Sequence, residues 1–414
     1  MIRLGALALL LLIVLVGGRR TPARFPVPAG IRLLFVTGSE FLLVGILLGP
    51  RALGILDAGV IEALRPFATV GLAFVGLHYG LQLEIPLLRT IPLFYSVAPA
   101  VQAAGGALAV GLPAWLWLRA WPADLRETLV AVLVLAAAAA CSTPAPLDML
   151  ALDRKYAGSP VLRMLRHLAE MGELPALALA GLALCWRQRT PVLPGTQGLF
   201  LLQWVGLAVG IGLLFGAALT LLPRVGKVGT GRLLVGGLAA TFFFGGMARY
   251  LHLSPLFVGL VAGITVANLP GPRRRVQALV HRMEGPFMMF LLLMAGAVGT
   301  LETPLGLGAA GVLAAAAVLV ALRLVGKGFA GVLLARTTHA LRNPPAGFGL
   351  GLVAQGGIAV AVALDYLEAG PGPFSSFVLA ATMFAVLVTE MVAPWMILRV
   401  LRADPASGDG EETP

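Results

Sequence analysis

Six ionisable residues and one histidine lie within or at the ends of long apolar stretches of this sequence: Glu40, Asp148, Glu170, Glu173, Lys327, Glu390 and His78. A charge at the middle of a membrane-spanning helix costs about 2.5–3.5 kcal/mol on insertion scales, so each of these residues needs a partner or a function. Carboxylate oxygens are suitable ligands for hard cations, and a carboxylate can bind a proton instead. The pattern therefore favours a carboxylate that alternates between a cation and a proton.

Glu173 is the first candidate for such a site. It follows the basic cluster Arg163, Arg166 and His167 by enough residues to lie roughly 15 Å along a helix, near the middle of a bilayer. Glu170, one turn earlier, can reach Arg166 at i−4 and His167 at i−3, as pairs on a helix surface do. We therefore interpret Glu170 as mainly structural, and Glu173 as a functional residue.

Lys327 has two interpretations. It lies near the end of an apolar run, so its side chain could extend to the membrane interface. Alternatively it turns inward and pairs with Glu173 as a charge partner, which leaves Arg323 without an explanation. We favour the inward orientation.

The remaining candidates are secondary. Glu390, deep in the last apolar run, has no partner that the sequence identifies, whereas Asp148 and Glu40 are expected to cap or solvate interrupted helices. Cys141 and Cys185 both lie in apolar segments, are too few for a disulfide framework or a metal-ligand pattern, and are predicted to pack in the core.

The composition places all of these residues in a membrane protein. Of 414 residues, 59% are hydrophobic and 12% charged, with a mean hydropathy of +0.93, which is outside the range of soluble domains. Runs without any charge, such as 90–118, 190–223 and 303–322, reach the roughly 20 residues that a spanning helix needs. The formal charge of +11 would suggest nucleic acid in a soluble protein, but here the basic residues separate apolar runs. The predicted partner is membrane lipid, not nucleic acid.

The sequence predicts an all-α polytopic protein with about thirteen spans, near 4–18, 32–50, 63–83, 90–118, 127–150, 160–186, 197–222, 232–249, 254–269, 284–301, 305–330, 346–366 and 374–400. The loops that follow odd-numbered spans lie on one side of the membrane and contain twenty basic residues. The opposite side contains only eight, which are Arg3, Arg51, Arg65, Arg119, Arg126, Arg187, Arg189 and Arg249. Basic loops stay in the cytoplasm, so we expect a bacterial-type inner-membrane protein with its N-terminus outside and its C-terminus inside.

The two ends carry separate expectations. Residues 1–18 resemble a signal peptide but lack a well-formed cleavage site, so they are interpreted as the first span. Residues 403–414 are acidic and lack large apolar residues, which predicts a disordered cytoplasmic tail. The sequence contains no phosphate-binding loop of the Walker type, which argues against an ATP-driven pump; neither an enzyme nor a cofactor is expected.

Two predicted spans look interrupted. In the fifth, Pro144 and Pro146 follow Ser142 and Thr143, and proline disturbs the hydrogen-bond ladder of a helix. In the twelfth, five glycines surround Gln355: Gly347, Gly349, Gly351, Gly356 and Gly357. Irregular backbone at membrane depth is tolerated where it lines a cavity, and the spacing of seven spans suits inverted repeats with a binding site between them. The alternative is that these glycines only allow close helix packing.

Several short motifs follow one another along the chain: 41–50 (FLLVGILLGP), 74–83 (FVGLHYGLQL), 253–268 (LSPLFVGLVAGITVAN), 284–286 (EGP) with 294–299 (MAGAVG), and 349–357 (GLGLVAQGG). Their order and their coverage, from about residue 30 to 400, carry a resemblance to the second branch of the monovalent cation/proton antiporters. It implies that Ser142 and Thr143 are the hydroxyl motif of the unwound helix, that Glu173 belongs to the ion-binding acidic pair, and that Lys327 is the family's lysine. The chain departs from the pattern at Gly172 and Gly356.

The resemblance implies two inverted repeats with two crossed discontinuous helices, in a single transporter domain at 1–402. A core bundle at about 90–186 and 305–400 would move against a scaffold at about 1–83 and 197–301, which forms a homodimer. The expected function is exchange of Na⁺ or K⁺ for H⁺, in the service of pH homeostasis, at Glu173, Thr143 and Ser142, with Lys327 as charge partner and Glu170, Asp148, Gln355 and Glu390 as secondary candidates. The alternatives are an ion-coupled carrier of an organic anion and a transport-inactive scaffold or sensor.

Overall fold

The structure, a computed structural model, describes residues 28–90, 92–153, 156, 158–190, 192, 200–221, 230–270, 273–301, 306–337, 345, 347–370 and 372–403. Every regular element in these ranges is a helix. The predicted first span at 4–18 and nearly all of the predicted tail lie outside the described residues. The all-helical fold class is confirmed.

Eight helices in the described part of the chain are long and apolar enough to cross a membrane. They are α4 (Ala58–Gly80), α6 (Leu93–Leu118), α7 (Leu125–Ala140) continued by α8 (Ala145–Ala151), α9 (Pro160–Arg187), α10 (Phe200–Leu221), α13 (Arg273–Val298), α14 (Ala309–Thr337) and α16 (Ser375–Arg402). A ninth is formed if α2 (Ala29–Thr37) and α3 (Glu40–Leu48), which are bent by 73°, count as one span.

The remaining helices are α5 (Ile85–Leu88), α11 (Thr230–Tyr250), α12 (Pro255–Asn268), the 3₁₀ helix η2 (Phe348–Leu352) and α15 (Gly357–Glu368). Each predicted segment from 32–50 onward therefore coincides with a helix or with two successive helices. The number of spans and the orientation of the termini stay predictions.

Local sequence explains where several helices begin. Ser159 and Ser254 precede prolines at the first turns of α9 and α12, and each hydroxyl accepts a hydrogen bond from the backbone N–H three residues later, at 3.2 and 2.9 Å. Asp57 does the same for α4, where its carboxylate accepts from Val60 N at 2.7 Å. These are the residue types that satisfy the free N–H groups of a helix start.

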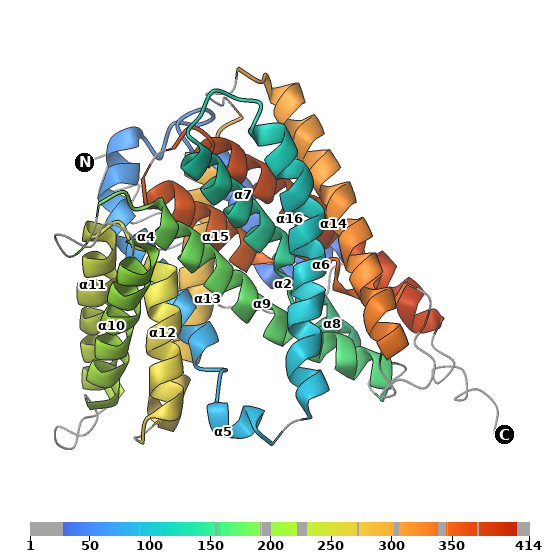
Figure 1. Cartoon of the computed structure of the whole chain (residues 1–414), viewed down its shortest axis with the longest axis horizontal. Helices are drawn as coiled ribbons and strands as arrows, with labels where there is room; N and C mark the ends of the chain where they lie inside the picture. Colours follow the sequence, from blue (N-terminus) through green and yellow to red (C-terminus); the bar gives the residue numbers. More distant parts are fainter. Residues whose placement is uncertain are drawn as a thin grey trace.

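The helices pack in two groups (Figure 1). On one side, α4 packs against α11, α12 and α13, and α10 packs against α12. On the other, α6 packs against α7, α9 and α14, while α16 packs against α14 and α15. These groups follow the predicted scaffold and core ranges, but the division into moving and static parts, like the homodimer, stays a prediction.

Glycines set the closest contact in the first group. A Cβ atom added at Gly76 or Gly80 of α4 would lie 1.9 or 2.1 Å from a backbone carbonyl oxygen of α12. Added at Gly259 or Gly263 of α12, it would lie 2.0 or 2.3 Å from one of α4. Small residues at a spacing of four allow such backbone contact. Glycine thus determines how closely α4 and α12 approach each other.

Two helices are interrupted, and their interruptions touch. α7 ends at Ala140 and α8 begins at Ala145, while η2 ends at Leu352 and α15 begins at Gly357. Thr143 N donates to Ala354 O at 3.0 Å, and Ser142 Oγ donates to Leu352 O at 3.2 Å. The crossed discontinuous helices that the sequence predicts are present. We call the two interruptions, 141–144 and 353–356, the crossed breaks.

Candidate ion site at the crossed breaks

A cavity of about 430 Å³ lies against the crossed breaks, between α4, α8, α9, α13 and the start of α15. Three carboxylates line it, from Asp148, Glu173 and Glu284, and none of the described lining residues is basic. The lining residues are Val36, Thr37, Tyr79, Thr143, Pro144, Ala145, Asp148, Glu173, Glu284, Gly285, Met288, Met289, Gly357 and Ile358. We call this space the acidic cavity.

Glu173 is the most deeply buried of the three acids, with 1% of its surface exposed. Tyr79, which lines the same cavity, lies beside its carboxylate. One carboxylate oxygen of Glu173, Oε2, is buried without a hydrogen-bond partner among the described residues. A buried acceptor is normally satisfied, so this oxygen is available to a proton or a cation.

The two hydroxyl residues of the first break take different positions. Thr143 lines the acidic cavity together with Glu173, and its Oγ1 accepts weakly from Ala145 N at 3.4 Å. Ser142 is buried behind the break, where its hydroxyl accepts from Lys327 Nζ at 2.8 Å. The structure therefore brings Thr143 to Glu173, and Ser142 to Lys327.

Lys327 of α14 points inward, with 1% of its surface exposed, which rules out an extension to the membrane interface. Its ammonium donates to Ala140 O and to Ser142 Oγ, each at 2.8 Å. The contacts that the structure assigns to this ammonium are thus to the first break, not to the Glu173 carboxylate. Its role as charge partner of Glu173 stays a prediction.

Arg323 is the residue that the sequence left unexplained, and it connects both breaks. Its guanidinium donates to Ala139 O at 2.9 Å, to Cys141 O at 2.6 Å and to Val353 O at 2.5 Å. Arg323 and Lys327 are four residues apart and therefore lie on one face of α14. That spacing of two basic residues within one long apolar stretch is the signal that could have identified Arg323.

The C-terminal end of α7 is capped entirely by side chains from distant segments. The last carbonyl groups of a helix have no partner within it. Here Ala138 O accepts from Gln355 Nε2 at 2.6 Å, and the next three carbonyls, at residues 139–141, accept from Arg323 and Lys327. Cations at this end also complement the negative pole of the helix dipole. The first break is therefore held open without any carboxylate.

Each of the secondary candidates has at least one partner, although Gln355 Oε1 and Glu390 Oε1 are buried without a hydrogen bond among the described residues. The Arg166 guanidinium contacts the carboxylates of Asp148 at 2.9 Å and Glu170 at 3.0 Å, which confirms the predicted contact between Arg166 and Glu170. His167 instead contacts Tyr95 O, at 2.8 Å.

Glu390 does have a partner, which the sequence did not identify. It is fully buried in α16, and Thr37 of α2 donates to its Oε2 at 2.9 Å. The two free cysteines are buried, as predicted.

The two departures from the family pattern have different structural settings. Gly356 has φ +75°, a conformation that disfavours side chains, and a Cβ atom there would lie 2.6 Å from Thr143 Cβ. Gly172 has open space, since the nearest atom to an added Cβ is Pro99 O at 3.9 Å. Glycine is thus required at 356 by the crossing of the breaks, whereas position 172 would accept a side chain.

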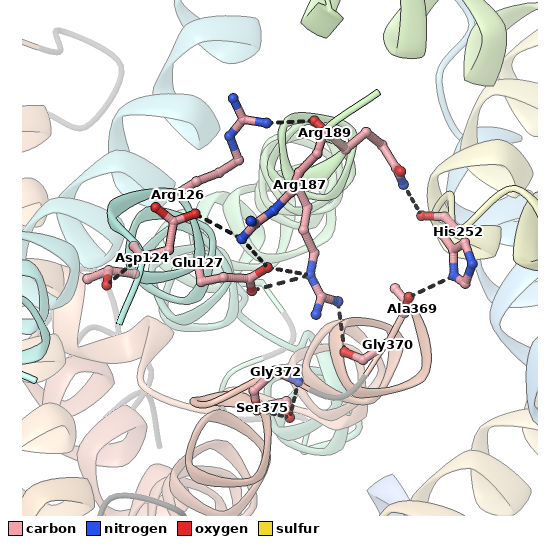
Figure 2. Close-up of polar contacts among 12 residues, drawn as sticks. Asp124, Arg126, Glu127, Arg187, Arg189, His252, Ala369, Gly370, Gly372 and Ser375 are labelled. Atoms are coloured by element: carbon pink, nitrogen blue, oxygen red, sulfur yellow. Dashed lines mark hydrogen bonds and ion pairs between the residues drawn. The ribbon is translucent and has the colours of Figure 1, made fainter. Parts of the chain in front are cut away.

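A second polar cluster lies at the start of α7 and the end of α9, and Figure 2 shows its contacts. Arg187 Nε contacts the Glu127 carboxylate at 3.3 Å, and Arg187 Nη1 donates to Gly370 O at 2.7 Å. Arg189 contacts Asp124 at 2.9 Å. We call this set the terminal ion-pair cluster, because it joins the start of α7, the end of α9 and the turn after α15.

Comparisons with known proteins support the fold. The sequence matches no protein-family model and no curated protein. The structure is similar to that of the sodium proton antiporter MjNhaP1 from Methanocaldococcus jannaschii at pH 8, with a TM-score of 0.61 and 15% sequence identity. The superposition covers 97% of this chain and 100% of that one. At this identity the similarity shows that the two proteins share a fold over nearly their whole length.

Proposed function

We propose that this protein is a secondary transporter that exchanges a monovalent cation for protons across a membrane, with Glu173 as the group that binds both. The observation that carries the proposal is the acidic cavity, in which a buried carboxylate with a free oxygen faces Thr143 beside two interrupted helices. The similarity to a sodium proton antiporter structure supports it.

The chemistry of the site suits competition between the two ions. Carboxylate, hydroxyl and backbone oxygens are ligands for hard cations. A buried carboxylate without a cationic neighbour is unfavourable as an anion, so it takes up either a proton or a metal cation. Because both ions need the same Glu173 oxygens, one must leave before the other binds. If the cavity opens to the two sides in turn, this competition produces exchange.

An organic-anion carrier is the second candidate, and it requires a basic group that faces the substrate. Arg323 and Lys327 lie next to the breaks, but their donors are used by backbone carbonyls and by Ser142. The cavity itself presents carboxylates. These contacts favour a cation as the transported species.

The third candidate is a transport-inactive scaffold or sensor, which the departures from the family pattern at Gly172 and Gly356 would suit. The positive φ of Gly356 and its contact with Thr143 give that glycine a structural reason. Its presence is therefore no sign of a lost function, and Gly172 leaves Glu173 in place.

The test is a flux assay in proteoliposomes with a pH-sensitive dye inside. Adding Na⁺, K⁺ or Li⁺ to preformed vesicles with an acidic interior should raise the internal pH for at least one of these ions, and the response should saturate with ion concentration. The same vesicles challenged with organic anions test the second candidate. A response to anions alone, or to no ion, would overturn the proposal.

A further inference from the structure

Two histidines and a glutamate meet beside the acidic cavity. His78 lies in the last turn of α4, while His281 and Glu284 lie one turn apart on α13. His78 Nε2 is 3.4 Å from Glu284 Oε2, and His281 Nδ1 is 3.7 Å from the same oxygen. All three ligand atoms lie within 4.8 Å of one another. None of the hydrogen bonds that the described residues form at the crossed breaks involves this cluster, and His78 and His281 do not line the acidic cavity.

The spacing is that of a metal site with three protein ligands. Zinc binds imidazole nitrogen and carboxylate oxygen at about 2.0–2.2 Å, so two ligand atoms of a tetrahedral site are about 3.3 Å apart. Two of the three separations are already close to that value, and a small rotation of the exposed His281 ring shortens the third. Imidazole ligands select transition metals over Mg²⁺ and Ca²⁺.

The surroundings leave the ligands free to bind. His281 is exposed over 84% of its side chain, whereas His78 and Glu284 are exposed over 17% and 26%. The contact that competes for His78 Nε2 is the Gln82 amide at 3.4 Å, which is long for a hydrogen bond. Gln82 Oε1 is itself buried without a partner among the described residues, so the amide has an oxygen to turn towards the site.

We propose that His78, His281 and Glu284 bind one first-row transition-metal dication of the Zn²⁺ class, with water in the open coordination position. Glu284 also lines the acidic cavity, so a metal held there places a double positive charge at the edge of the space in front of Glu173. A bound dication repels incoming monovalent cations and slows their exchange. The inhibitory part rests on the proposed function, whereas the binding part does not.

Binding is tested directly on the purified, tag-free full-length protein in detergent, by calorimetric titration with ZnCl₂. The expected result is one Zn²⁺ per chain, with affinity reduced at least about tenfold in His281→Ala and in Glu284→Gln. His281→Ala removes an exposed side chain, so its folding is not at risk. The matched control is His252→Asn, which removes a histidine that lies near the terminal ion-pair cluster, away from the proposed metal site. Asparagine is chosen because it tolerates the positive φ of 54° at this position.

Equal zinc binding by wild type and His281→Ala, or no stoichiometric binding by wild type, would overturn the metal site. Inhibition is then measured in proteoliposomes as the Zn²⁺ concentration that halves cation-driven proton flux, which should rise at least tenfold in His281→Ala. Zinc that binds without slowing flux would overturn the inhibitory part alone. A wild-type protein that shows no flux would contradict the proposed function, while the titration still decides the site.

Discussion

The crossed breaks and the terminal ion-pair cluster place basic side chains at the two ends of α7, but they use the positive charge differently. In the cluster each arginine faces a carboxylate, as Arg187 faces Glu127. At the breaks, Arg323 and Lys327 face carbonyl groups. Among the described residues no salt bridge holds Glu173, and the nearby Lys327 ammonium donates to the first break instead. This arrangement suits the proposed exchange of ions at the Glu173 carboxylate.

The largest expected effect comes from Glu173→Gln, which tests whether the free carboxylate matters. Glutamine keeps the size and the hydrogen bonding of the protonated side chain but cannot ionise, so cation-driven proton flux should fall to the level of empty vesicles. Folding should survive, and the melting temperature should stay equal or rise, because an uncompensated buried charge costs several kcal/mol.

Glu170→Gln is the matched control, since that carboxylate already contacts Arg166, and it should retain flux. Sustained flux through a well-folded Glu173→Gln protein would remove Glu173 from the site and direct attention to Asp148 or Glu390. A poorly folded Glu173→Gln protein would instead indicate a structural role.

Arg323→Met breaks the cap of α7 and should be the most destabilising single change. Three buried carbonyls lose a charged donor, and each unsatisfied group costs about 1–3 kcal/mol, so the loss should be at least about 3 kcal/mol. Thermal unfolding in detergent measures it. An unchanged melting temperature would mean that water replaces the guanidinium and that the breaks do not depend on it.

Lys327→Met should destabilise by about 1–3 kcal/mol, because Ala140 O and Ser142 lose their donor. Combining it with Glu173→Gln sharpens the comparison. If the ammonium is also the charge partner of Glu173, the two effects are non-additive by at least about 0.5 kcal/mol. Strict additivity would assign Lys327 to the break alone.

Arg187→Met tests the terminal ion-pair cluster and should cost less, about 1–2 kcal/mol, because its groups are partly exposed and water can replace the arginine. The same unfolding measurement applies. A loss as large as that of Arg323→Met would show that ion pairs, and not carbonyl capping, dominate the stability of α7.

Gly172→Ala should have the smallest effect, within about 1 kcal/mol and on the stabilising side, since the site has open space and alanine favours a helix. Gly356→Ala is its counterpart and should destabilise by about 1–3 kcal/mol because of the positive φ. Equal melting temperatures for the two variants would contradict the packing of the crossed breaks.

Local spacing predicted much of this molecule. Proline and glycine located the breaks, the depth of Glu173 in its helix predicted a buried acid, and the i−4 spacing predicted the contact of Glu170 with Arg166. The partners of Arg323 could not be predicted, because they are backbone carbonyls 184 and 182 residues earlier and 30 residues later, and every residue has a carbonyl. Tyr79 and Glu284 were missed for a related reason, since their place in the cavity depends on which apolar helices are neighbours.

The glycine contact between α4 and α12 has a mechanical consequence. At Gly76, Gly80, Gly259 and Gly263 the two backbones touch with no side chain between them. If α4 slid along α12, the backbone carbonyl oxygens of one helix would clash with the backbone of the other. The two helices therefore move together as one rigid unit. Any rocking that carries Glu173 from one side of the membrane to the other must therefore take place along seams where flexible side chains, and not backbones, meet.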